Sequence, residues 1–84
     1  MNAEQIYSSY FDRTFFAFRP EVRRQIEARI DEVGTELRAF RHHQLTGSKQ
    51  FRLRVGYYRV IYRFDVSRNE IYLLEVGHRR KIYR

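Results

Sequence analysis

The last third of the chain contains a short run in which apolar and basic residues alternate. Phe51, Leu53 and Val55 take turns with Arg52 and Arg54. Successive side chains of a β-strand point to opposite faces, so both arginines must project from the same face. The spacing predicts a strand that closes a core on one side and carries guanidinium groups on the other.

A second run predicts the partner strand of a hairpin. Two sets of residues are expected to take opposite faces, with Tyr58, Val60, Tyr62 and Phe64 on one and Arg59, Ile61 and Arg63 on the other. Gly56 stands where the chain must reverse, and tight turns favour glycine because it adopts positive φ. Asn69, which tolerates positive φ, ends the turn before a third strand over Glu70 to Val76. These segments predict a meander with one cationic face.

The N-terminal half predicts one strand and two helices. Gln5 to Tyr10 is expected to form a short edge strand, and Phe11 to Phe18 a short helix with Asp12 as its N-cap. Pro20 suits the first turn of a second helix, in which Val22, Ile26, Ile30 and Val33 repeat at helical spacing. We therefore predict one α+β domain over residues 1–84, with two N-terminal helices on one face of a twisted antiparallel sheet of about four strands.

The composition favours a polyanionic partner. The chain has 17 Lys and Arg against 10 Asp and Glu, a net charge of +7, and Lys49 and Lys81 are its two lysines. The planar fork of arginine matches phosphate oxygens and stacks on bases, which indicates nucleic acid, although a solvated basic surface remains the alternative. The chain lacks cysteine, an apolar run near the ~20 residues of a membrane span, and a signal-peptide core, so a cytoplasmic protein is predicted.

Two groups of residues invite a metal site, and neither is convincing. His42 and His43 are adjacent, and neighbouring side chains of an extended chain point to opposite faces. His78 is the third and last histidine, and there is no cysteine to add a ligand. Glu27 and Asp31 lie one helical turn apart and are interpreted as part of a solvated helix face. We expect no metal and no other cofactor.

The basic strip suits metal-free cleavage of RNA. A guanidinium cannot act as a general base, because its pKa exceeds ~12, but it stabilises the charge that develops on a reacting phosphate. Arg54, Arg59 and Arg79 are the natural phosphate clamps. Histidine is the side chain suited to proton transfer near neutral pH, so His78 is the best acid or base, and Tyr83 is the alternative proton carrier or a stacking group. Contacts to the RNA strand are further expected from Lys49, Arg52, Arg80 and Lys81.

Several spaced segments resemble the RelE/ParE superfamily of type II toxin–antitoxin toxins. They are Leu45-Thr46-Gly47, Phe51 to Gly56, Tyr58 to Tyr62, Val76 to Arg79, and Ile82-Tyr83. The resemblance implies a growth-arresting toxin that cleaves mRNA on translating ribosomes of a bacterial or archaeal cytoplasm. It also implies a small acidic antitoxin as partner, with operator DNA bound only through the antitoxin complex.

The same resemblance assigns roles to particular residues. The basic strand positions of the RelE branch are matched by Arg52 and Arg54, the arginine of the next strand by Arg59, and the tail groups by Arg79 and Tyr83. The strand positions are lysine in the best-known members, so arginine here keeps the charge but removes a neutral amine base. The gap between Arg79 and Tyr83 is also shorter than in that branch.

Three other interpretations stay open. A ParE-like toxin would inhibit DNA gyrase without any nuclease activity. A non-toxic member would only bind its antitoxin. In the third interpretation, Arg52, Arg54 and Arg59 only keep the edges of an exposed sheet soluble.

Overall fold

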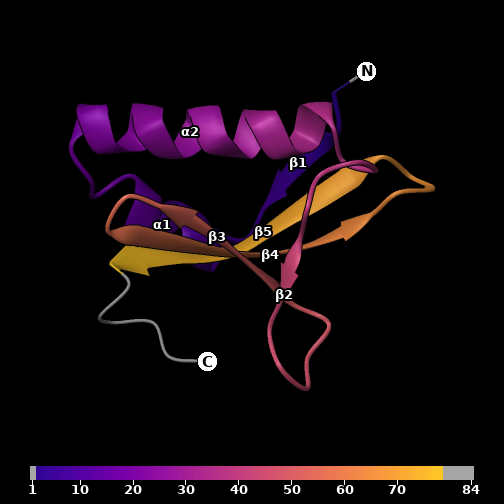
Figure 1. The fold of residues 1–84 in the computed structure, drawn as a ribbon. Helices are drawn as coiled ribbons and strands as arrows, with labels where there is room; N and C mark the ends of the chain where they lie inside the picture. The colour runs from indigo at the N-terminus through magenta and orange to yellow at the C-terminus, as the bar shows by residue number, and fades with distance from the viewer. Residues whose placement is uncertain (1, 79–84) are drawn as a thin grey trace.

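The computed structural model describes residues 2–78 and contains two helices and five strands. In chain order these are β1 (Glu4–Tyr7), α1 (Ser9–Phe15), α2 (Pro20–Thr35), β2 (His43–Gln44), β3 (Phe51–Val55), β4 (Tyr58–Asp65) and β5 (Glu70–His78). Figure 1 shows α2 lying across one side of the twisted sheet, while the loop between β2 and β3 extends away from α2.

The strands form one sheet in the order β1-β5-β4-β3-β2. The predicted α+β class is confirmed, with both helices on one face, but the sheet is mixed and has five strands rather than about four. β1 pairs in parallel with β5, which the expectation of a purely antiparallel sheet missed. A parallel pair needs a long crossover, and here the two helices and the rest of the sheet lie between its strands in sequence.

The core lies between the helices and the inner face of the sheet. Its helical side chains include Phe11 and Phe15 of α1 and Ile26, Ile30 and Val33 of α2. The hairpin strands contribute alternate residues, as the sequence pattern predicts: Leu53, Val55, Val60 and Tyr62. Strand β5 adds Ile71, Leu73 and Val76, whose spacing is broken by a shift of register. Burial of this apolar surface, at about 25 cal/mol per Å², is the main force that holds α2 on the sheet.

Helix α1 begins earlier than predicted because Ser8, not Asp12, is its N-cap. The Ser8 hydroxyl accepts a hydrogen bond from the Phe11 N–H at 3.0 Å and donates one to the Leu74 carbonyl at 2.8 Å. A carboxylate has no proton to donate, so an aspartate would make only the first of these bonds. The helix ends at Phe15, so Phe18 lies beyond it and packs against Tyr58, with ring centroids 5.1 Å apart.

The predicted turns are confirmed in position and conformation. Gly56 closes the β3–β4 hairpin with φ +58°, and Asn69 precedes β5 with φ 52°. Both angles lie in the left-handed region, where most side chains are strained. Strand β5 runs to His78, two residues past the predicted end at Val76.

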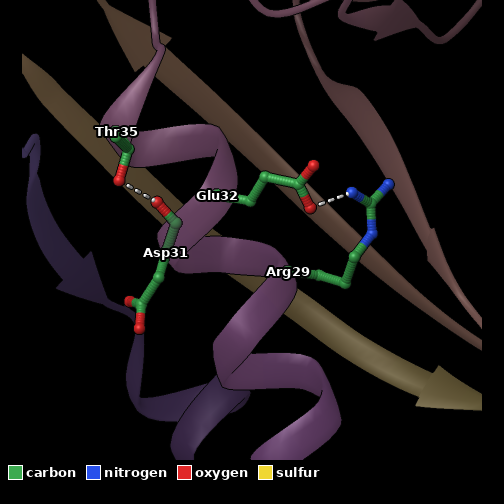
Figure 2. A network of polar contacts seen from close by, with 4 residues as sticks. All are labelled: Arg29, Asp31, Glu32 and Thr35. Carbon is green, nitrogen blue, oxygen red and sulfur yellow. Dashed lines mark hydrogen bonds and ion pairs between the residues drawn. The ribbon is translucent and has the colours of Figure 1, made fainter.

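Polar contacts on α2 point to opposite sides of the helix. Arg29 pairs with Glu32 at 2.5 Å on one side, and Asp31 projects on the other (Figure 2). The Asp31 carboxylate accepts a hydrogen bond from Gln5 Nε2 at 2.6 Å and so ties α2 to the edge strand β1. No helix within residues 2–78 is long and apolar enough to cross a membrane.

Candidate functional site

The sheet face turned away from the helices, called the open face below, carries the predicted arginines. Arg54 lies directly opposite Arg59, and Arg59 lies opposite Gly77 of β5. One row further from the hairpin turn, Arg52 lies opposite Ile61. The alternation that puts Leu53 and Val60 in the core thus places these three arginines together on the open face.

Arg54 and Arg59 bring two like charges together on neighbouring strands. Residues directly opposite on neighbouring strands have Cβ atoms about 5 Å apart, and like charges at that distance destabilise a sheet unless an anion lies between them. Arg54 is exposed and Arg59 is half-buried. Arg54 also lines a groove of about 350 Å³ with Arg29 and Val55, so it can reach around the edge of β3. This pair can clamp one phosphate group.

An apolar cluster of Leu45, Ile61 and Leu74 interrupts the open face. Ile61 is fully buried, although the alternation places it among exposed arginines, because Leu45 from the loop after β2 packs over it. The cluster lies between the Arg54–Arg59 end of the sheet and Arg63, which lines a separate hollow with Tyr72. The basic strip is therefore shorter than the sequence suggests.

His78 does not join the arginines on the open face. It lies opposite Tyr58, and therefore on the helix side of the sheet, with the two rings 5.7 Å apart. Its ring is also parallel to that of Tyr57 in the hairpin turn, with an interplanar angle of 1°. His78 and the Arg54–Arg59 pair thus share one end of the sheet but face opposite sides.

The other predicted site residues lie elsewhere. Lys49 is part of the loop after β2, where it lines a hollow made by residues 44–49. Four tail residues of the predicted site fall outside the described part of the chain: Arg79, Arg80, Lys81 and Tyr83. Their roles remain predictions.

His42 is a structural residue. Its ring stacks on Phe64 with centroids 3.9 Å apart, its Nε2 lies 2.8 Å from the Leu37 carbonyl oxygen, and its Nδ1 lies 2.6 Å from the Tyr62 hydroxyl. A carbonyl can only accept, so Nε2 donates and Nδ1 accepts from Tyr62. Both nitrogens are engaged in hydrogen bonds, while the adjacent His43 is exposed opposite Arg52. Within residues 2–78, no three His, Asp or Glu side chains gather closely enough to hold a metal ion.

Burial raises the pKa of the Tyr62 hydroxyl, although the positive charge of Arg29 opposes the shift. An unfolded tyrosine titrates near pH ~10, so the folded state holds the proton more tightly than the unfolded state does. This contribution to stability is complete below the unfolded pKa and is lost as the pH rises above it.

We expect the urea midpoint of the protein to fall as the pH rises from about 9 to 11. Tyr62→Phe should have a lower midpoint at neutral pH, because the hydroxyl that binds His42 is gone, and a shallower alkaline decline. Equilibrium unfolding at several pH values measures both. An equally steep decline in the variant would show that Tyr62 is not the group responsible.

The sequence and the fold have counterparts among known proteins. Residues 2–83 match the family model described as the ParE toxin of the type II toxin–antitoxin system, parDE. The chain belongs to this toxin family. It is thus a toxin of the RelE/ParE superfamily, as the spaced sequence segments indicate. No curated protein sequence matches the toxin.

Solved structures share its fold. A chain of the intact Escherichia coli RelBE toxin–antitoxin complex superposes with a TM-score of 0.76 at 20% identity, covering 98% of this chain and 99% of that one. A chain of the RelBE2 complex of Mycobacterium tuberculosis gives a TM-score of 0.75 at 20% identity, covering 93% and 92%. A chain of the archaeal RelE–RelB complex of Pyrococcus horikoshii gives 0.75 at 20% identity, covering 98% and 100%.

Proposed function

We propose that this toxin is a metal-independent endoribonuclease that cleaves mRNA, with translating ribosomes as its site of action. The observation that carries the proposal is the cross-strand pair Arg54–Arg59, with Arg52 one row away on the same face. Two guanidiniums held opposite each other on neighbouring strands, with Arg54 exposed and Arg59 half-buried, support binding of one phosphodiester. The net charge of +7 supports a polyanionic substrate.

The proposed reaction needs alignment, charge neutralisation and two proton transfers. The ribose 2′-oxygen attacks the adjacent phosphorus, the bond from phosphorus to the 5′-oxygen breaks, and the products are a 2′,3′-cyclic phosphate and a 5′-hydroxyl. Arg52, Arg54 and Arg59 neutralise the charge on the non-bridging oxygens. The 2′-hydroxyl loses a proton and the leaving 5′-oxygen gains one, and His78 and Tyr83 are the candidate groups for these transfers. Since His78 faces the helix side, the RNA would cross the hairpin end of the sheet to meet it.

We infer that an acidic antitoxin neutralises the toxin by covering the arginines of the open face. Several structural relatives were solved as toxin–antitoxin complexes, which supports such a partner. A segment that folds on binding suits a surface of this charge, and operator DNA would be contacted only through the complex.

The order in which syntheses stop after induction tests the proposed function. Pulse labelling of induced cells should show protein synthesis falling first, while DNA synthesis continues. The reverse order would reject the nuclease.

The second candidate is inhibition of DNA gyrase, and the match to a family model named for ParE toxins favours it. Such an inhibitor binds a protein and performs no RNA chemistry. Early loss of DNA synthesis, with gyrase inhibited in a supercoiling assay, would support this candidate.

A further inference from the structure

Tyr57 lies at the tip of the β3–β4 hairpin and is unusually open for a large aromatic side chain. It is 68% exposed, the highest value among the exposed large hydrophobic residues of the described chain. A turn residue of small or polar type would satisfy the backbone as well.

The Tyr57 ring is held in a defined orientation. It lies parallel to the His78 ring, with centroids 6.1 Å apart and an angle of 1° between the planes. Aromatic pairs at 4.5–7 Å favour offset stacking, so His78 supports one side of the tyrosine. His78 is itself fixed by its contact with Tyr58, whose ring centroid is 5.7 Å away. An exposed ring supported in this way is a ready surface for another flat group.

Tyr57 is also close to the proposed phosphate clamp. The hairpin is closed by the pair Val55 and Tyr58, and the next pair along the ladder is Arg54 and Arg59. Tyr57 is therefore one residue from the closing pair, at the same end of the sheet as both arginines. Single-stranded nucleic acids bind where cationic groups track the backbone and aromatic rings stack on bases, and this end of the sheet offers both.

We propose that Tyr57, whose ring lies parallel to that of His78, stacks on one unpaired base of the RNA whose phosphate is held by Arg54 and Arg59. This inference rests on the proposed RNA substrate. An aromatic ring can stack on any base, so Tyr57 adds affinity and fixes the position of the RNA strand, and it does not select a sequence. It would fix which phosphate lies between the arginines.

A tryptophan probe tests the contact directly. The chain has no tryptophan, so Tyr57→Trp introduces a single tryptophan whose emission can be excited selectively over that of the tyrosines. We expect an uncleavable 2′-O-methyl RNA pentamer to quench this emission on binding. Tyr10→Trp is the matched control, because Tyr10 is 56% exposed but lies in α1, which packs on the sheet face opposite to the arginine pair. Equal quenching of the two probes would overturn the proposal.

Affinity measurements separate this inference from the function on which it rests. Tyr57→Ala should weaken binding of the pentamer roughly tenfold, and an abasic nucleotide at one position should weaken the wild type equally while adding nothing in the variant. Tyr57→Ala should leave the salt dependence unchanged, whereas each lost phosphate contact lowers the slope by about 0.7. If Arg52→Ala/Arg54→Ala no longer binds the pentamer and Tyr57→Ala binds it as tightly as the wild type, the stacking role of Tyr57 is rejected and the proposed RNA substrate is not. If the wild type binds no RNA, both the stacking role of Tyr57 and the proposed nuclease activity are rejected.

Discussion

The double variant Arg52→Ala/Arg54→Ala should cleave RNA at least roughly 100-fold more slowly than the wild type, because it removes two groups that stabilise charge on the reacting phosphate. Both side chains are exposed on β3, so their loss leaves the core intact. We expect the thermal midpoint to change little, since exposed substitutions usually cost within about 0.5 kcal/mol. Single-turnover cleavage with purified protein and ribosomes measures the rate, and calorimetry measures the midpoint.

The control must remove the same charge from another surface. Arg24→Ala/Arg38→Ala does so, because Arg24 and Arg38 are exposed and lie in or just after α2. This variant should cleave RNA at the wild-type rate in the same assay. If the two double variants lose the same activity, the effect comes from net charge rather than from the open face.

The largest stability effect should follow from His42→Ala. The substitution removes the stack on Phe64 and leaves the buried Tyr62 hydroxyl and the Leu37 carbonyl without their partner. A lost aromatic contact together with unsatisfied buried groups costs about 3 kcal/mol. In a domain of this size that lowers the thermal midpoint by roughly 10–20 °C.

The adjacent histidine provides the comparison for this variant. His43→Ala removes the same side chain from an exposed position on β2 and should shift the midpoint by no more than a few degrees. Circular dichroism melts of both proteins suffice. If His42→Ala melts within a few degrees of His43→Ala, the hydrogen bonds of His42 do not hold the chain after α2 onto the sheet.

Period-two and helical patterns in the sequence were sufficient to predict the main elements. The alternation at Phe51–Val55 and Tyr58–Phe64 gave the hairpin, its faces and the place of Arg52, Arg54 and Arg59. The helical repeat from Val22 to Val33 gave α2. In these elements one face is buried, so apolar residues recur in the sequence with the period of the strand or helix.

The features that were missed depend on contacts distant in sequence. The two-residue strand β2 is too short to have a period, and the parallel pairing of β1 follows from where the helices return the chain. Ile61 belongs to the arginine side by alternation but is buried by Leu45, which no local pattern reveals. His78 was placed with the arginines, and the register with Tyr58 puts it on the other side.

The most direct test of RNA cleavage at the arginine face is to map RNA ends after adding the purified toxin to a reconstituted translation reaction. We predict new 5′-hydroxyl ends paired with 2′,3′-cyclic phosphates within translated mRNA, and their loss with Arg52→Ala/Arg54→Ala. Intact mRNA with the wild-type toxin would contradict the account, and inhibition of purified gyrase by the same preparation in a separate supercoiling assay would favour the second candidate function.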